Sequence, residues 1–245
     1  MTPATRRRPG GHAARALRTR CGVIAATTVL AVSNVVSNRL WPRAYLPWNV
    51  TVATGLLALA LRCGLSWSDL GLTRSRLRRG LLAGGAAAGS VAALYLAAFT
   101  MPATRGMFVD ERATGPLSKA LFAAFVRIPL GTVLLEELAF RGVLPGLVGG
   151  PWWRRTVISS ALFGLWHVLP SLEMTKVDTG VGAMTGRWGP VGHATLAVLA
   201  TFAAGVALSA HRRWGGHLAA PMLAHLATNS LGVLLAWGTG RAQRR

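Results

Sequence analysis

The sequence predicts an all-α fold, a polytopic transmembrane bundle of about seven to eight helices. Its composition is the first reason: 52% of the 245 residues are hydrophobic and 14% are charged, whereas about 25% of the residues in a typical soluble domain are charged. The second reason is that the apolar residues gather in uncharged runs. Each run is close to or above the ~17–25 residues that a helix needs to cross the hydrocarbon of a bilayer.

Each predicted helix corresponds to one of these runs. Six of them carry no charge at all, at residues 21–38, 44–61, 80–104, 156–172, 188–210 and 214–240. A seventh run, at residues 117–147, is interrupted by several charged side chains. We therefore expect seven crossings, with one crossing that differs in character from the others.

The basic residues lie mainly between the runs. The formal net charge is +20, and the arginines cluster at residues 6–8, 74–79, 154–155 and 212–213, as the positive-inside rule expects for cytoplasmic loops. We therefore expect a multi-pass protein of the plasma membrane with a cytoplasmic N-terminus, surrounded by the lipid bilayer and without a nucleic-acid partner. Seven crossings would leave Arg241 on the outer side, so the orientation of the C-terminus stays open.

Two adjacent glutamates, Glu136 and Glu137, lie inside the seventh run, in the stretch VLLEELAFRG. An acidic residue at the centre of a spanning helix costs about 2.5–3.5 kcal/mol, so such residues are usually paired, turned inward and functional. Arg141 follows Glu137 at the spacing of one helical turn, whereas Glu136 is rotated by about 100°. We infer that Glu137 and Arg141 pair and leave Glu136 free to act. The alternative is that all three charges are solvated at the membrane surface.

Two further predicted helices carry polar side chains. The stretch ALFGLWHVLPS places His167 one turn after Phe163, and LAHLATNS places His225 and Asn229 on one helix face. Each histidine alone is more often a hydrogen-bonded core residue than a functional one. Counted from the predicted inner loops at ~1.5 Å per residue, both histidines and Glu136 fall roughly 15–20 Å deep, so they could line one polar pocket.

The three patterns Glu-Glu-x-x-x-Arg, Phe-x-x-x-His and His-x-x-x-Asn follow one another in this order. The ordered set resembles the CPBP family of intramembrane proteases, which comprises the CAAX prenyl endopeptidases and their bacterial relatives and is also called the ABI family. The resemblance covers a protease-like core at residues 117–235, about half of the chain. Charge and hydropathy divide the rest into a basic cytoplasmic tail (1–20), N-terminal transmembrane helices (21–116) and a basic C-terminal tail (236–245).

The resemblance implies an intramembrane endopeptidase that hydrolyses a peptide bond of a membrane-associated or CAAX-like protein. Glu136 with His167 would activate a water molecule, and His225 with Asn229 would stabilise the developing oxyanion. The motif positions expected to support these side chains are Glu137, Arg141 and Phe163.

A metal is the open point. Glu136, His167 and His225 could supply three ligands to a catalytic zinc, with water in the fourth position. The sequence has no HExxH pair, which would indicate zinc directly, so we favour a glutamate-activated water without a tightly bound metal and keep zinc as the alternative. Two other functions also stay open: a non-proteolytic membrane protein with an immunity or scaffold role, and an ion-coupled transporter that relays protons through Glu136 and His167.

Overall fold

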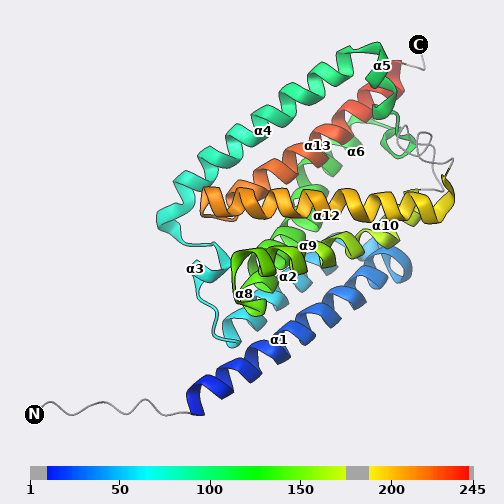
Figure 1. Cartoon of the computed structure of the whole chain (residues 1–245). Coiled ribbons are helices and arrows are strands. Elements are labelled where there is room, and N and C mark those ends of the chain that lie inside the picture. Colours follow the sequence, from blue (N-terminus) through cyan, green and yellow to red (C-terminus); the bar gives the residue numbers. More distant parts are fainter. Residues whose placement is uncertain (1–9, 175–187, 243–245) are drawn as a thin grey trace, which may run out of the picture.

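The computed structural model describes residues 10–174 and 188–242, and within them the chain is a bundle of long helices without a β-strand (Figure 1). Seven helical segments are long and apolar enough to cross a membrane: Leu17–Leu40, Pro42–Arg62, Trp67–Thr100, Leu117–Val148, Trp152–Met174, Gly189–Gly215 and Ala219–Gly240. The predicted polytopic helical bundle is confirmed, and the protein is a multi-pass membrane protein.

The first three segments contain the long helices α1 (Gly10–Val35), α2 (Tyr45–Arg62) and α4 (Leu77–Thr100). α1 begins inside the stretch expected as a tail, because the residues there are largely alanine and arginine, which favour helix. A π-helical turn, η1 (Val36–Leu40), extends α1 before the chain reverses, and the short helix α3 (Trp67–Leu70) precedes α4.

The fourth segment changes its helical type along its length. It consists of α6 (Leu117–Phe122), the π-helical η6 (Ala123–Val133), α7 (Leu134–Glu137), the π-helical η7 (Leu138–Val143) and α8 (Leu144–Val148). Pro129 is one cause, because proline has no N–H and its ring collides with the carbonyl of the preceding α-helical turn. In the wider turn, the amide of Leu134 donates to the carbonyl of Pro129. Such π-turns are rare and occur frequently at functional sites.

The last three segments are formed by α9 (Trp152–Trp166) with α10 (Val168–Met174), then α12 (Gly189–Gly215), and finally α13 (Ala219–Ala242). The run expected as one helix at residues 156–172 is therefore interrupted at His167. α13 continues into the expected basic tail at residues 236–245. The described N-terminal and C-terminal ends lie at opposite ends of the bundle (Figure 1), as an odd number of crossings requires.

Small residues allow α4 to pack closely against α13, the helix that carries His225. A Cβ atom added to Gly84 would lie 2.8 Å from the carbonyl oxygen of Ala219 and 2.9 Å from Cβ of Leu223. Neither neighbour can rotate away, because one is backbone and the other is the first side-chain atom. In a membrane, where lipid tails are as apolar as leucine, such close backbone approach is a main source of helix association.

We expect Gly84→Ala to destabilise the protein, because overpacking a helix contact costs about 1–3 kcal/mol. The neighbouring Gly85 is a matched control on the same helix, since a Cβ there meets nothing within 4 Å. Gly85→Ala is therefore expected to be neutral or stabilising. The measurement is the thermal midpoint of both variants in detergent. Equal midpoints would show that α4 and α13 do not pack as closely as described.

Candidate active site

The charged residues of the fourth segment are buried. The exposed fraction is 4% for Glu136, 0% for Glu137 and 1% for Arg141. The interpretation in which these charges are solvated at a membrane surface is therefore wrong, since protein atoms enclose all three. Burying a charge is costly unless other protein groups compensate it, so each of these side chains needs a partner.

Glu137 has one partner on its own helix and another on α13. Nη1 of Arg141 lies 3.2 Å from Oε1 of Glu137, as the spacing of one turn predicts. His225 donates from Nδ1 to the same oxygen over 2.8 Å, because a carboxylate can only accept. The guanidinium of Arg141 also lies over the ring of Phe163, 4.0 Å from its centre. Glu137 thus connects the fourth segment to α13.

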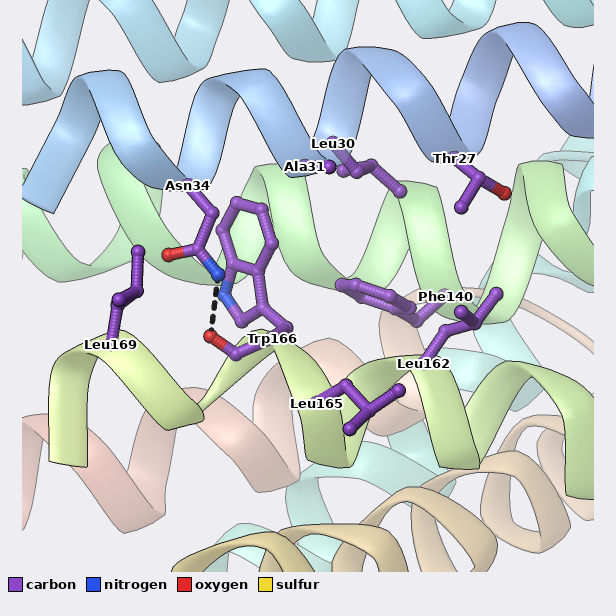
Figure 2. A pocket seen from close by; sticks show the side chains of 9 residues that line it. All are labelled: Thr27, Leu30, Ala31, Asn34, Phe140, Leu162, Leu165, Trp166 and Leu169. Carbon is purple, nitrogen blue, oxygen red and sulfur yellow. Dashed lines mark hydrogen bonds between the residues drawn. The ribbon is translucent and has the colours of Figure 1, made fainter. Parts of the chain in front are cut away.

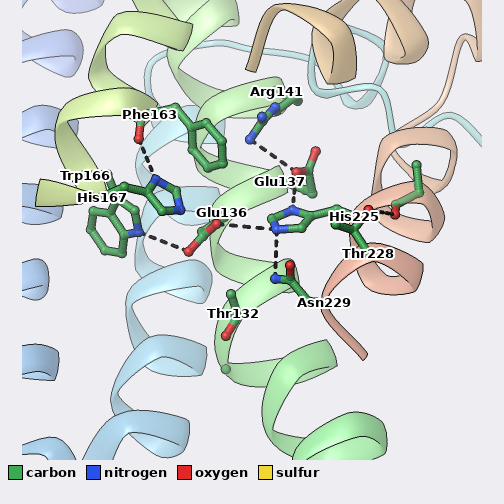
Figure 3. A network of polar contacts seen from close by, with 12 residues as sticks. Thr132, Glu136, Glu137, Arg141, Phe163, Trp166, His167, His225, Thr228 and Asn229 are labelled. Carbon is green, nitrogen blue, oxygen red and sulfur yellow. Dashed lines mark hydrogen bonds and ion pairs between the residues drawn. The ribbon is translucent and has the colours of Figure 1, made fainter. Parts of the chain in front are cut away.

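Glu136 lies in a different environment (Figure 3). Its Oε1 accepts a hydrogen bond from the indole Nε1 of Trp166, with 3.0 Å between the atoms. Its Oε2 is buried without a hydrogen-bond partner and lies 3.8 Å from Nε2 of His225, which is too far for a hydrogen bond. Oε2 of Glu137 is also buried without a hydrogen-bond partner, so the position of Oε2 of Glu136 beside His225 is what sets it apart. Oε2 of Glu136 is available to accept a proton or a hydrogen bond from a small molecule beside it.

His225 and Asn229 form a pair on α13. Because Nδ1 of His225 donates to Glu137, the lone pair of the neutral ring lies on Nε2. Nδ2 of Asn229 donates to this nitrogen over 3.1 Å. The two side chains therefore present a ring nitrogen and an amide group to the side on which Oε2 of Glu136 lies (Figure 3).

His167 lies at the junction of α9 and α10, with φ −86° and ψ −1°. Its Nδ1 donates to the carbonyl oxygen of Phe163 over 2.8 Å, so the lone pair of the neutral ring lies on Nε2. Figure 3 shows this second nitrogen turned toward Glu136. The ring of Phe163 packs edge to face against His167, with 4.6 Å between centroids, and lies 6.3 Å from the ring of His225. The main-chain carbonyl of Phe163 thus fixes the tautomer of His167, and the ring of Phe163 packs against the imidazole.

The structure brings the predicted site residues of three membrane segments together (Figure 3). Glu136 comes from α7, and His225 with Asn229 comes from α13. These three side chains form a chain of contacts no longer than 3.8 Å. His167 joins them through the ring of Phe163 rather than through a direct polar contact. Their roles in a reaction stay predictions.

The zinc alternative does not fit this geometry. Among the residues that the structure describes, no three His, Cys, Asp or Glu side chains are grouped so that they could hold a metal ion. Glu136, His167 and His225 are therefore not arranged as a ligand set, and no catalytic step is assigned to a metal.

Two residues of the site lie outside the sequence patterns. Trp166 contacts Glu136, and Asn34 of α1 donates from Nδ2 to the main-chain carbonyl of Trp166 over 2.7 Å. A tryptophan in an apolar run suggests a packing role, so the sequence did not indicate Trp166 as a site residue. Asn34 did offer a signal, because it is a buried amide inside an uncharged run, where polar side chains are usually paired and functional.

The polar cluster lies in the part of the chain that matches a known family. Residues 118–231 match the family model described as type II CAAX prenyl endopeptidase Rce1-like, which confirms the resemblance predicted from the three sequence patterns. No curated protein and no solved structure matches the chain.

Proposed function

We propose that the buried polar cluster of this chain, whose residues 118–231 belong to the type II CAAX prenyl endopeptidase Rce1-like family, is the active site of a protease. In this proposal the cluster hydrolyses a peptide bond through an activated water molecule. Family membership gives the coarse activity, an intramembrane endopeptidase. The observation that carries the mechanism is the buried Oε2 of Glu136, which has no hydrogen-bond partner. A general base must have such an oxygen within hydrogen-bond reach of the water that it deprotonates.

In this mechanism Glu136 and His167 bind the water. Oε2 of Glu136 takes a proton from the water. Nε2 of His167 accepts a hydrogen bond from the other O–H group and so orients the water. The oxygen adds to the carbonyl carbon of the peptide bond, and the carbonyl oxygen becomes an oxyanion. When the tetrahedral intermediate collapses, the C–N bond breaks and Glu136 returns its proton to the leaving amine. Water is consumed and two peptide products result, so atoms and charges balance.

Asn229 and His225 stabilise the oxyanion in the proposed mechanism. The amide N–H of Asn229 can donate without any change of protonation. His225 donates from Nε2 only when both ring nitrogens carry protons, and Glu137 supports that form because it accepts from Nδ1 over 2.8 Å. Once Nε2 of His225 carries a proton it can no longer accept from Asn229, so both groups can then donate to the oxyanion. Such donors contribute strongly to catalysis in a site that excludes water.

The substrate in this proposal is a membrane-associated or CAAX-like protein. The cluster lies within helices that could cross a membrane, so a water-soluble peptide would have to leave water to reach it. We further propose that the protein resides in the plasma membrane with a cytoplasmic N-terminus. The basic clusters at residues 74–79, 154–155 and 212–213 lie toward those ends of the third, fifth and sixth segments that would share one side of the membrane with the N-terminus.

The test compares membrane peptides from cells that produce the wild-type protein, Glu136→Gln or Glu111→Gln. Glu111 is an exposed control outside the spanning segments. We expect cleavage products in wild-type and Glu111→Gln cells and none in Glu136→Gln cells, and these products identify the substrate. Identical peptides in all three would contradict a protease and favour the immunity or scaffold role. pH-dependent solute flux into liposomes without cleavage would favour the transporter.

A further inference from the structure

The indole of Trp166 is the hydrogen-bond donor to Glu136. Nε1 lies 3.0 Å from Oε1, and the Trp166 side chain is buried, with 7% of the residue exposed. A hydrogen bond to an ionised group is roughly twice as strong as one between neutral groups. This bond therefore holds Oε1 of Glu136 against Trp166, and it leaves Oε2 as the oxygen beside His225.

The position of Trp166 follows from the end of α9. In a continuous helix the carbonyl of Trp166 would accept from the amide four residues later, but that residue is Pro170, which has no N–H. Nδ2 of Asn34 takes the place of the missing donor, 2.7 Å from the carbonyl oxygen. Asn38 in turn donates to Oδ1 of Asn34 over 2.7 Å. A helix outside residues 118–231 therefore holds the main chain of Trp166.

The ring of Trp166 is also held by its neighbours (Figure 2). It packs edge to face against Phe140, with 5.9 Å between centroids. On the side of α1 it lines an apolar cavity of about 290 Å³, together with Leu30 and Leu162. The ring thus has an apolar wall on one side and a single polar atom that reaches Glu136. This arrangement is typical of buried tryptophan, which combines a large apolar surface with one N–H donor.

We infer that Trp166 is a positioning residue, which holds Oε1 of Glu136 so that Oε2 faces the water, and that Asn34 of α1 keeps Trp166 in place. The inference rests on the proposed function and assigns an active-site role to a helix that the family match does not cover. Trp166 itself does not touch the reacting atoms. It acts through Glu136, so its loss should slow the chemical step without weakening substrate binding.

Trp166→Phe tests the inference because it removes the N–H and keeps most of the apolar wall. We expect kcat to fall about 10–100-fold, the range for losing a hydrogen bond to a charged group, while KM stays within about 2-fold. Trp48→Phe is the matched control, because Nε1 of Trp48 donates to Ser33 over 3.0 Å and not to Glu136. It should leave both constants unchanged. Equal kcat values for the two variants, or a raised KM alone, would overturn the inference.

Asn34→Leu provides a second variant, since leucine is close in size to asparagine and lacks its donor. We expect a smaller fall in kcat, of about 3–10-fold, again at unchanged KM. This variant answers the question if Trp166→Phe does not fold. If Asn34→Leu had the same kcat and KM as the wild-type protein, α1 would have no role in positioning Trp166.

A spectroscopic measurement separates this inference from the proposed function. In protein labelled with ¹⁵N-tryptophan, the indole N–H signals of Trp166 and Trp48 are assigned by their loss in the two phenylalanine variants. Glu136→Gln should shift the Trp166 signal and leave the Trp48 signal in place, whether or not the protein is a protease. An unmoved Trp166 signal would contradict the contact itself. A shifted signal in a protein that cleaves nothing would reject the proposed function and keep the contact.

Discussion

Purified Glu136→Gln protein is expected to lose about 10²–10⁴-fold in kcat, the contribution of a positioned general base, and to keep its thermal stability. The amide has nearly the same shape as the carboxylate, and its oxygen can still accept from Nε1 of Trp166. It cannot take a proton from water. The fall in rate should therefore appear at every substrate concentration, and it is measured as cleavage of the substrate that the peptide comparison identifies.

The expected stability follows from the surroundings of the carboxylate. Oε2 has no hydrogen-bond partner, and the nearest nitrogen of His225 lies 3.8 Å away. A buried charge with so little compensation destabilises the folded state, so the neutral amide should leave the thermal midpoint unchanged or raise it. A midpoint well below that of the wild-type protein would show that Glu136 has a structural role. Full activity at an unchanged midpoint would remove Glu136 from the mechanism.

The seven membrane segments could be predicted because hydropathy is a property of each segment by itself. In lipid every backbone group must be satisfied within the segment, so an uncharged run of sufficient length predicts a helix without any knowledge of its neighbours. The pairing of Glu137 with Arg141 was predictable for the same reason, since one turn separates them on a single helix. Both predictions depend only on local geometry.

The interruptions of the helices were marked in the sequence but were not predicted. Pro129 lies within η6, and Pro170 removes the donor for the last carbonyl of α9. Proline inside an apolar run usually indicates a kink or a break, and the break after Trp166 is what gives His167 its position between two helices. The local signal was present, and only its consequence for the site required the structure.

The supporting contacts could not be predicted because their partners are distant in the chain. Asn34 and Trp166 are separated by 132 positions, and neither residue type at its own position indicates the other. Such contacts depend on which helix faces which, and the apolar pattern of a membrane helix does not encode this. The motif residues were recognisable from their spacing, whereas the residues that orient them were recognisable only from the contact between Asn34 of α1 and the main chain of Trp166.

Glu137→Gln is expected to lower the thermal stability, which Glu136→Gln does not lower, although the two residues are adjacent. Removing one partner of a buried ion pair costs about 3–5 kcal/mol, which corresponds to a fall of roughly 6–20 °C in the thermal midpoint for a chain of this length. The reason is Arg141, whose Nη1 and Nη2 are buried and have no hydrogen-bond partner. Without Glu137 its charge would be left with the ring of Phe163 and the more distant Glu136.

The double variant Glu137→Gln/Arg141→Met separates the lost ion pair from other effects. Replacing both charges of a buried pair is often close to neutral, so the double variant should recover most of the stability that Glu137→Gln loses. The exposed control Glu111→Gln should change nothing. Activity should stay low in the double variant, because the glutamine oxygen still accepts from Nδ1 of His225 but no longer carries the charge that supports its protonated form. A double variant as unstable as Glu137→Gln would show that Glu137 stabilises the bundle through His225 rather than through Arg141.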